Sequence, residues 1–335
     1  MTLRIGLVGC GRVAAKHFES IREPFELVAV CDTDPAARDQ ASSRHDVPGY
    51  GSLEAMLNEM ALDVVTLATP TGLHADQTIV SAKHGVHVIT EKPMATRWTD
   101  AQRMVQACEA ANRRLFTVKQ HRFSAPVAAL RRVIESGSLG RIYDVHLSVL
   151  WTRPQSYYDL AEWRGTWEMD GGALMNQAIH YVDLVRWIVG PVESVHAYTA
   201  TLARRIEVED TAAMAMRFRC GALGTVNVTM LTHPANFEAS LTVIAEHGTV
   251  RLGGVACNRI DHWQVQDVPP PENPEPSQNL YGDGHGPFYR DVATALTQGH
   301  PGLIEGAEGM KSLELIVAAY RSAQEGRRLS LPLDL

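Results

Sequence analysis

Hydrophobic and polar positions in the first third of the chain alternate between strand-length and helix-length patterns. Continuous apolar runs, which indicate strands buried on both faces, occur at residues 3–9, 25–30, 63–70, 86–93 and 114–122. Helical periods separate them, from Ala15 onward, over 71–85 and from about Thr99 to Asn112. A repeated strand–helix order of this kind predicts a doubly wound parallel sheet. We therefore expect an α/β Rossmann domain over residues 1–122.

The pattern changes after a helix predicted at 126–136. Apolar and polar residues then alternate with a period of two, which indicates strands with one buried and one part-exposed face, at 141–151, 192–202, 211–219, 222–232, 237–253 and 259–266. The sequences CGA (220–222) and EHGT (246–249) are turn signals for hairpins. These features predict an α+β domain over residues 123–335 with a large open, mainly antiparallel sheet.

Three further features belong to this second domain. We expect the proline-rich stretch at 268–279 to be a surface loop, a glycine-rich loop near residue 282 to open a helix, and a last helix to cover about 304–326. A broad open sheet face is a common surface for self-association. We therefore expect a homo-oligomer, either a dimer or a tetramer, formed through the sheet.

Length and composition limit the class of protein. A chain of 335 residues, with 45% hydrophobic and 21% charged residues, fits a globular protein of two domains. A net charge of −7 with dispersed basic residues argues against nucleic acid as the main partner. We expect no secretion signal, and no apolar run approaches the roughly 20 residues that cross a bilayer. Five scattered cysteines without metal-ligand spacing indicate reduced thiols, a cytoplasmic location and no metal site.

The first predicted strand leads into GCGRVA (9–14), a G-x-G-x-x-A sequence that opens a helix. Glycines in this context permit a tight turn and let backbone N–H groups approach a pyrophosphate. The second strand ends in Asp32, at the distance where an acid binds the ribose 2′-hydroxyl and repels a 2′-phosphate. We therefore expect NAD rather than NADP, with a glycine turn that binds no ligand as the alternative. The loop residues assigned to the cofactor are Gly9, Gly11, Arg12 and Val13.

Three other segments follow predicted strands and so reach the edge of the sheet where ligands bind. They carry Thr69-Pro70, Glu91-Lys92-Pro93 and Gln120. This position brings Lys92 to the cofactor crevice, although a lysine after a strand is also common on a protein surface. We assign cofactor binding to Thr69, Pro70, Glu91, Lys92 and Gln120.

Residues 170–184, DGGALMNQAIHYVDL, form an amphipathic run opened by two glycines. Asn176 and His180 are four residues apart and Asp183 follows three later, so a helix would project all three in the same direction. The other residues are apolar enough for a largely buried helix that ends at Gly190-Pro191. The segment is therefore either a core helix with a few satisfied polar residues or a helix that presents a site.

Together these residues resemble the glucose–fructose oxidoreductase and inositol dehydrogenase superfamily. The resemblance covers nearly the whole chain and rests on GCGRVA, Glu91-Lys92-Pro93, Trp163-Arg164 before the GGAL helix start, and His180-x-x-Asp183. It implies an NAD-dependent oxidoreductase in which Lys92 reaches the substrate near the nicotinamide and His180 exchanges a proton with the reacting hydroxyl. With the family in view, we also assign His74, Trp163 and Arg164 to the cofactor site.

One position departs from the sugar and inositol dehydrogenases, which usually have an Asp four residues before the catalytic His. This chain has Asn176 there. The segments ALMNQ-x-IH, KQ-x-RF and GDGHGPFY resemble more closely the UDP-N-acetylglucosaminuronic acid 3-dehydrogenases of bacterial polysaccharide pathways. This resemblance implies oxidation of the C3 hydroxyl of a UDP-N-acetyl-hexosaminuronate to the 3-keto sugar. The alternatives are a dehydrogenase of a free polyol such as an inositol, and a catalytically silent NAD-binding redox sensor.

Oxidation of an alcohol requires a base for the hydroxyl proton, and the titration of histidine near neutral pH suits His180 to this role. Lys92 would stabilise the developing alkoxide. Asn176 cannot titrate, so we expect it to orient His180 or a substrate hydroxyl. Asp183 would bind a ring hydroxyl, hold the His180 tautomer, or be a buried structural carboxylate.

A UDP-uronate carries negative charges that cations would bind. Arg122, Arg153 and Arg164 lie in segments expected to face the crevice, although each can instead be a solvated surface group. The aromatic residues 151, 157, 158, 163 and 167 would wall a sugar pocket or pack in the core. We assign substrate binding to Lys92, Arg122, Arg153, Tyr158, Asn176, His180 and Asp183.

Overall fold

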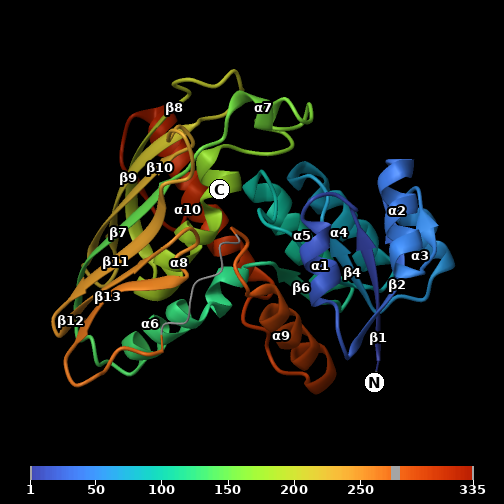
Figure 1. Ribbon diagram of the computed structural model, residues 1–335, viewed down its shortest axis with the longest axis horizontal. Coiled ribbons are helices and arrows are strands. Elements are labelled where there is room, and N and C mark those ends of the chain that lie inside the picture. The colour runs from blue at the N-terminus through green and yellow to red at the C-terminus, as the bar shows by residue number, and fades with distance from the viewer. Residues whose placement is uncertain (1, 273–279, 334–335) are drawn as a thin grey trace. The chain divides into compact units, whose positions relative to one another are not determined.

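The computed structural model describes residues 2–272 and 280–333 (Figure 1). The chain divides into two compact units, residues 1–118 with 285–310 and residues 119–284 with 311–335. The domain boundary expected at residue 122 stays a prediction. Most of the proline-rich stretch at 268–279 lies outside the described residues, so the loop expected there also stays a prediction.

The first unit contains a six-stranded parallel sheet in the order β3-β2-β1-β4-β5-β6. This is the order of the doubly wound dinucleotide-binding fold, so the predicted Rossmann sheet is confirmed. Its strands are β1 (Leu3–Val8), β2 (Phe25–Cys31), β3 (Gly49–Tyr50), β4 (Val64–Leu67), β5 (His87–Thr90) and β6 (Leu115–Thr117). Its helices are α1 (Ala14–Ser20), α2 (Pro35–His45), α3 (Leu53–Glu59), η1 (Thr71–Leu73), α4 (His74–Lys83), α5 (Trp98–Ala110) and α9 (His285–Gln298).

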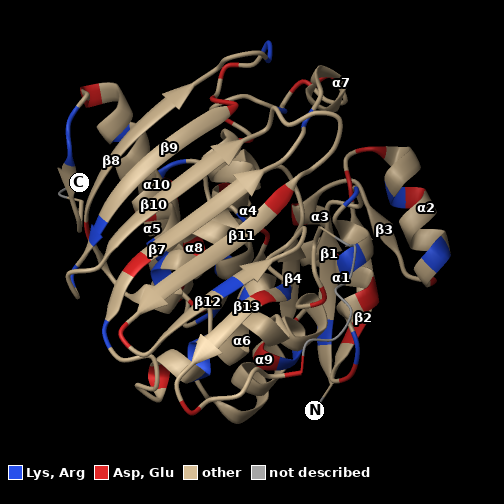
Figure 2. Cartoon of the chain, turned by 60° about the vertical axis from the view of Figure 1, so that its left-hand side comes forward, with Lys and Arg blue, Asp and Glu red and all other residues tan. Residues whose placement is uncertain are grey.

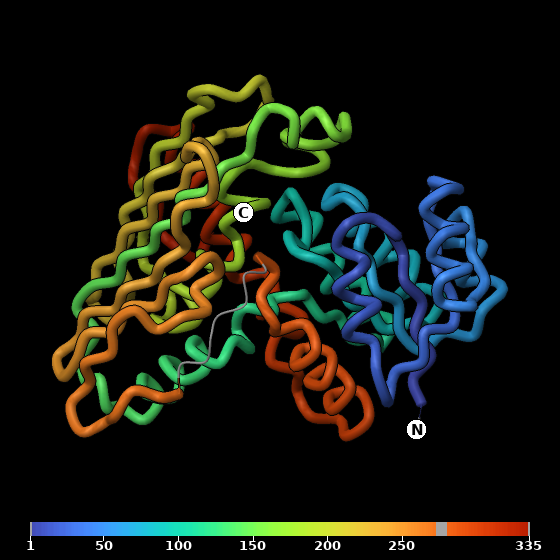
Figure 3. The backbone as a smooth tube through the Cα atoms, in the orientation of Figure 1, coloured from blue at the N-terminus to red at the C-terminus, as the bar shows by residue number. Residues whose placement is uncertain are grey.

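The strands of this sheet are buried on both faces, as their continuous apolar runs require. Ile5 and Leu7 of β1, Val64 and Val65 of β4, and Ile89 of β5 are fully buried. Helix α9 comes from the far end of the sequence yet packs against α1, where the red and blue helices lie side by side in Figure 3. The spacing of apolar residues within either helix does not predict the contact between α9 and α1.

Some elements differ from the predicted ones. The strand expected at 114–122 is wrong beyond Thr117, because residues 120–123 form the 3₁₀ helix η2 (Gln120–Phe123). The polar side chains of η2 are buried, so the polar residues that interrupt the apolar pattern here do not indicate an exposed segment. The strand expected at 86–93 ends at Thr90. The pattern also missed α2, whose sequence PAARDQASSRH is polar on nearly every side.

The second unit contains an eight-stranded sheet in the order β13-β12-β11-β7-β10-β9-β8-β14. Strands β7 and β10 are parallel and the other pairs are antiparallel, as expected for a mainly antiparallel sheet. Its strands are β7 (Ile142–Leu150), β8 (Val192–Ala200), β9 (Thr211–Phe218), β10 (Leu223–Thr229), β11 (Glu238–Ala245), β12 (Gly248–Gly253), β13 (Arg259–Val265) and β14 (Leu329–Ser330). Its helices are η2, α6 (Ala125–Glu135), α7 (Gln155–Tyr158), η3 (Ala173–Gln177), α8 (Ile179–Val189) and most of α10 (Ala307–Glu325).

Helices α6, α8 and α10 cover one face of this sheet, and Figure 2 looks onto its other face. Val145, Leu147 and Val149 of β7 are buried, while His146 and Ser148 alternate with them and belong to the other face. The alternation therefore sorts the residues of each strand between the helix-covered and the uncovered face. The middle of the uncovered face carries few charged residues (Figure 2).

The helix expected over DGGALMNQAIHYVDL consists of two segments, so the prediction of one continuous helix is wrong. Residues 173–177 form the π-helix η3, and α8 begins only at Ile179. The backbone N–H of Ala178 bonds to the carbonyl of Ala173 at 2.9 Å, a span of five residues. Since a π-turn is wider than an α-turn, the four-residue spacing of Asn176 and His180 does not by itself fix their relative direction.

All five cysteines are free. Burial, followed by the charge of Asp32, raises the pKa of the Cys10 thiol to about 11.

In the part of the chain that the structure describes, no helix is long and apolar enough to cross a membrane. The same residues contain no group of three His, Cys, Asp or Glu side chains placed to hold a metal ion.

Candidate active site

The loop between β1 and α1 lets a ligand approach its backbone closely. Gly9 has a φ of +92°, and a Cβ there would lie 2.6 Å from the carbonyl oxygen of Ala68, so position 9 requires glycine. A Cβ at Gly11 would meet no atom within 4 Å, which means that this residue borders open space. Arg12 is exposed and Val13 is half-buried at the start of α1. The loop thus has the bare, accessible backbone that a pyrophosphate needs.

The carboxylate of Asp32 organises the same loop from the end of β2. Its Oδ2 accepts the backbone N–H of Cys10 at 2.7 Å, and its Oδ1 accepts that of Asp34 at 2.9 Å. The side chain is therefore held beside the glycine loop. Its other lone pairs can accept ribose hydroxyls, and its charge would repel a 2′-phosphate.

Glu91 lies in a buried hydrogen-bond chain beneath the Lys92 loop. Its Oε1 accepts from His17 Nε2 at 3.1 Å and its Oε2 accepts the backbone N–H of Lys92 at 2.9 Å, while His17 Nδ1 lies 2.9 Å from the Tyr289 hydroxyl. Burial alone would raise the pKa of Glu91, but hydrogen bonds and charges from His17 and His285 hold that pKa well below its usual value. The ionised carboxylate therefore fixes the backbone at Lys92, whose side chain is half-buried.

His74 joins two of the loops that follow strands. Its Nε2 lies 2.9 Å from the carbonyl oxygen of Thr69, and its Nδ1 lies 2.9 Å from that of Pro93. Burial lowers the pKa of this imidazole, and the two carbonyl oxygens oppose the shift. The hydroxyl of Thr69 also donates to Gln77 Oε1 at 2.6 Å. The loop with Thr69 and Pro70 and the loop with Lys92 are thus tied together.

In the second unit, η3 carries Asn176 and α8 carries His180. The amide nitrogen of Asn176 donates to Asp170 Oδ1, and Asp170 Oδ2 accepts the backbone N–H of Gly165 at 2.7 Å. His180 is 6% exposed, and its ring centroid lies 4.7 Å from that of His121. The orientation of the Asn176 amide is therefore fixed by Asp170, and the imidazole of His180 is packed against a second imidazole.

The structure brings Arg122 and Asp183 together in an ion pair. Arg122 Nε lies 2.6 Å from Asp183 Oδ2 and Nη2 lies 2.8 Å from Oδ1, while Lys119 Nζ lies 3.6 Å from the same carboxylate. Burial would raise the pKa of Asp183, but Lys119 and Arg122 lower it to about 2. This geometry favours the structural carboxylate among the roles considered for Asp183. Substrate binding by Arg122 and Asp183 stays a prediction.

Two guanidinium groups surround the ring of Tyr157. Arg153 Cζ lies 5.3 Å and Arg164 Cζ lies 4.5 Å from its centroid. Arg164 donates to the Tyr157 hydroxyl at 2.7 Å, and Arg153 Nε donates to Gln177 Oε1 at 3.0 Å. Within the described residues, neither arginine has a carboxylate partner. The cluster of Arg153, Tyr157, Arg164 and Gln177, here called the arginine cluster, therefore holds two cations in fixed positions without a counter-ion.

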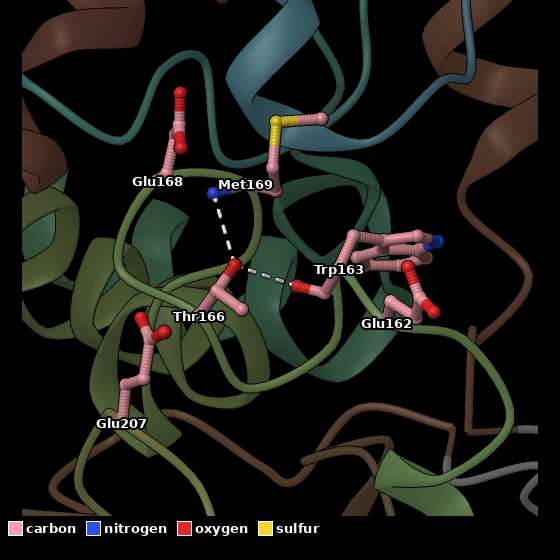
Figure 4. Close-up of a pocket in the computed structure, with 6 residues that line it drawn as sticks. All are labelled: Glu162, Trp163, Thr166, Glu168, Met169 and Glu207. Carbon is pink, nitrogen blue, oxygen red and sulfur yellow. Dashed lines mark hydrogen bonds between the residues drawn. The ribbon is translucent and has the colours of Figure 1, made fainter.

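Trp163 stacks against Arg164, with 4.5 Å between the guanidinium carbon and the ring centroid, and lines an open hollow shown in Figure 4. Thr166 donates to the Trp163 carbonyl at 2.8 Å and accepts the N–H of Met169 at 3.3 Å. The other residues that line the hollow are Glu162, Glu168 and Glu207. Three carboxylates make this hollow unfavourable for a phosphate group.

Two other predicted site residues are buried. Tyr158 is 7% exposed and packs edge-on against Tyr157, with 5.1 Å between ring centroids. Gln120 is 2% exposed and donates from Nε2 to the Tyr281 carbonyl at 3.3 Å. Its Oε1 is buried and has no hydrogen-bond partner among the described residues.

The sequence placed His121 in a segment at the edge of the sheet without giving it a role, and it indicated no role for His17 or Glu209. His17 follows the buried Ala14 by three residues on α1, a spacing that could have placed it on the inner face. His121 and Glu209 contact residues from distant parts of the sequence, which no local spacing reveals.

Comparisons with known proteins identify the family of this chain. Residues 3–119 match the family model described as the NAD-binding Rossmann fold of an oxidoreductase family, and residues 131–331 match its C-terminal alpha/beta domain. The chain belongs to this oxidoreductase family. The predicted membership of the glucose–fructose oxidoreductase and inositol dehydrogenase superfamily is thereby confirmed.

This oxidoreductase is 50% identical to the WlbA dehydrogenase from Bordetella pertussis, solved in complex with NADH and UDP-GlcNAcA, over 100% of both chains with a TM-score of 0.93. It is also 50% identical to the WlbA dehydrogenase from Chromobacterium violaceum, solved with the same two ligands, over 100% of this chain and 97% of that one with a TM-score of 0.93. A more distant relative is the D-apiose dehydrogenase of Rhizobium rhizogenes, 25% identical over 341 residues that cover 98% of this chain and 97% of the relative.

The first unit of the oxidoreductase fits NAD, the cofactor of its family domain. Position 9 has no room for a side chain, position 11 borders open space, and Asp32 presents a carboxylate at the end of β2. These are the three features that a dinucleotide requires of a Rossmann loop.

Proposed function

We propose that this protein is an NAD-dependent dehydrogenase that oxidises the C3 hydroxyl of a UDP-N-acetyl-hexosaminuronate to the 3-keto sugar. The observation that carries the proposal is 50% identity, over the whole chain, to two dehydrogenases whose structures hold NADH and UDP-GlcNAcA together. The 25% identity to a D-apiose dehydrogenase gives much weaker support to a free sugar as substrate.

Two side chains act on the reacting hydroxyl in this proposal, and a third positions the substrate. His180 accepts the hydroxyl proton, because an alcohol is too weak an acid to lose it unaided. Lys92 stabilises the oxygen as negative charge develops on it. Asn176 orients a neighbouring substrate hydroxyl. Bound NAD would supply the hydride acceptor for the carbon that carries the reacting hydroxyl. The proposal requires Lys92 and His180 to reach one substrate hydroxyl.

Contacts within each unit support these roles. The backbone of Lys92 is held by the Glu91 carboxylate, and its loop is tied to Thr69 through His74. The amide of Asn176 is held by Asp170. Such contacts limit the positions that a reacting group can take, and precise positioning is a large part of catalysis.

We assign the negative groups of the substrate to the arginine cluster. Stacking on Tyr157 orders the guanidinium groups of Arg153 and Arg164 before a ligand binds, and guanidinium geometry matches both phosphate and carboxylate. A free polyol offers no anion to this cluster, which therefore favours a nucleotide sugar over an inositol. Arg122 is already paired with Asp183 and is not needed for this role.

We further propose that a second copy of the chain covers the uncovered face of the large sheet, giving a homo-oligomer. Tyr198 on β8 is 73% exposed, and Ala213 and Ala215 of β9 and Asn227 of β10 are exposed too. Small, uncharged side chains with an exposed aromatic suit a protein interface better than solvent. The free cysteines support a cytoplasmic location.

A substrate panel tests the proposed reaction. Purified protein is mixed with NAD and, separately, UDP-GlcNAcA, UDP-GlcNAc, the free uronate and myo-inositol, with and without a keto acid that can reoxidise bound cofactor. We expect reduced nicotinamide with UDP-GlcNAcA, and transfer of deuterium to the cofactor only when the label is at C3. Turnover of myo-inositol alone would support a polyol dehydrogenase, and cofactor binding without any turnover would support a redox sensor.

A further inference from the structure

Glu209 is a buried acid that the proposed reaction does not use. It lies just before β9 and is 3% exposed. Its backbone carbonyl accepts the N–H of Ala173 at 3.0 Å, and its Oε1 accepts the N–H of Leu174 at 2.8 Å. The hydroxyl of Tyr320 donates to the same Oε1 at 2.9 Å and accepts the N–H of Met175 at 3.3 Å.

These contacts occupy the first three N–H groups of η3. The N–H groups at the start of a helix have no partner within the helix, so something else must satisfy them. Here the backbone carbonyl of Glu209, its carboxyl group and the Tyr320 hydroxyl each accept one of these bonds from outside the segment. Glu209 and Tyr320, from the loop before β9 and from α10, thus form a cap on the π-helix.

Gly172 makes this cap sterically possible. A Cβ at Gly172 would lie 1.7 Å from Glu209 Oε2, so the carboxyl group occupies the space that any other residue would fill. The second glycine of DGGALMNQ is therefore required by the approach of Glu209.

The capped segment carries the residues of the proposed site. Asn176 is the fourth residue of η3, and α8 with His180 begins two residues after η3 ends. The wide turn is closed by the bond from Ala178 N–H to the Ala173 carbonyl, and the Ala173 N–H donates to the backbone carbonyl of Glu209. The next residue, Leu174, donates its N–H to the Glu209 side chain. π-turns occur frequently at functional sites, where their extra residue redirects a side chain.

We propose that Glu209, together with Tyr320, is a positioning residue that keeps η3 in its π-helical form and so sets the placement of Asn176 and His180. The catalytic meaning of this placement rests on the proposed function. The geometric part, that the cap maintains the π-turn, does not depend on the reaction.

The protonation of Glu209 suggests the informative substitution. Burial raises its pKa to about 7, against the opposing effect of the Leu174 N–H and the Tyr320 hydroxyl, and the charge of Asp210 adds to the rise. Oε1 can accept its two hydrogen bonds whether or not the other oxygen carries a proton. A glutamine keeps one carbonyl oxygen of the same shape, so Glu209→Gln should preserve the cap. Glu209→Ala removes the bonds to the Leu174 N–H and the Tyr320 hydroxyl and leaves only the backbone bond to the Ala173 N–H.

Steady-state kinetics compare Glu209→Gln, Glu209→Ala and a control, Glu305→Ala, which removes a carboxylate paired with Arg114 in the first unit. We expect Glu209→Ala to lower kcat about 10- to 100-fold, as misplaced catalytic groups do, with the KM for NAD unchanged. Glu209→Gln should keep kcat within about 3-fold of wild type, and Glu305→Ala should lose stability without losing kcat. Normal kcat in folded Glu209→Ala, or equal loss in both Glu209 variants, would overturn the proposal.

Two further measurements cover other outcomes. If Glu209→Ala does not fold, Tyr320→Phe removes only one hydroxyl of the cap and should still lower kcat; wild-type kcat in that variant overturns the proposal. Crystal structures of wild type and the variant that folds decide the geometric part: we expect residues 173–177 to leave the π-helical form and Asn176 to leave Asp170. An unchanged π-turn overturns it. If wild type oxidises no nucleotide sugar, the proposed function is wrong. The crystal structures still test whether the cap maintains the π-turn.

Discussion

Arg122 and Asp183 form a two-pronged ion pair between η2 and α8, with 2.6 Å and 2.8 Å between the bonded atoms and 1% exposure of each side chain. Arg122 also lies over the ring of Trp187, 5.1 Å from its centroid. The pair fixes η2, which carries His121, against the helix that carries His180. It therefore links the stability of the second unit to the arrangement of the proposed base.

Asp183→Ala should destabilise the protein by about 3–5 kcal/mol, because it removes the buried carboxylate that Arg122 and Lys119 share. Urea unfolding measures the loss. The control is Glu135→Ala, which breaks an exposed pair with Arg131 on α6 and should cost about 0.5 kcal/mol or less. A loss below about 1 kcal/mol for Asp183→Ala would contradict the structural role. If the fold survives with a greatly raised substrate KM, the carboxylate instead binds substrate.

The stability of the protein should depend on pH through Glu209. Burial raises its pKa in the folded state from 4.5 to about 7. Folded protein therefore holds this proton more tightly than unfolded protein, so the stabilisation is full below pH 4.5 and is lost as pH rises through about 7. The free energy of unfolding of wild type relative to Glu209→Gln should fall by about 3 kcal/mol over this range. Parallel pH curves for the two proteins would show that Glu209 is not protonated in this window.

Alanine should affect the stability of the protein at one loop glycine and NAD binding at the other. Gly9→Ala forces a side chain into a left-handed conformation and against the Ala68 carbonyl, so it should lower the free energy of unfolding by about 1–3 kcal/mol. Gly11→Ala meets no protein atom, so stability should be unchanged while the added methyl group obstructs the pyrophosphate and weakens NAD binding. Thermal unfolding and NAD titration separate the two effects. Unchanged NAD affinity in Gly11→Ala would remove this loop from the cofactor site.

Asp32→Ala should lower NAD affinity about 10- to 100-fold, the value of hydrogen bonds to a charged group, and should lower or abolish the preference over NADP. The carboxylate both supports the Cys10 and Asp34 amides and repels a 2′-phosphate. Fluorescence titration with both cofactors measures the change, and Asp39→Ala, an exposed acid on α2 paired with Arg38, is the control. Wild-type affinity for NADP equal to that for NAD would refute the role of Asp32.

His180→Ala should lower kcat about 10²- to 10⁴-fold, the usual contribution of general acid–base catalysis. NAD binding should persist, since the loop of Gly9 and Gly11 belongs to the other unit. His84→Ala, at an exposed histidine of the first unit, should change neither quantity. A large loss of melting temperature with normal kcat would mean that His180 is only a core residue.

Features encoded by neighbouring residues could be predicted from the sequence. The order of βα units, the glycine loop before α1, Asp32 at the end of β2 and the alternating strands of the second sheet all follow from local periods and turn residues. The family resemblance added Lys92, Asn176 and His180. In each case a few adjacent residues are sufficient to specify the feature. Glycines leave the backbone accessible to a pyrophosphate, and alternating apolar residues give each strand one apolar face.

Features that join distant residues could not be predicted. The partner of Arg122 is 61 residues away, and Glu209 caps a turn 35 residues before it. The sequence shows a buried-looking run with Asn176 and His180, but the π-turn that separates them depends on Glu209 and Tyr320 arriving from other elements. The sequence by itself therefore determined the fold class, because local patterns specify elements, and its family resemblance indicated the residues of the proposed site. The tertiary structure decided which polar groups are paired and which remain available for a ligand, because a buried polar group must find its partner wherever the folded chain supplies one.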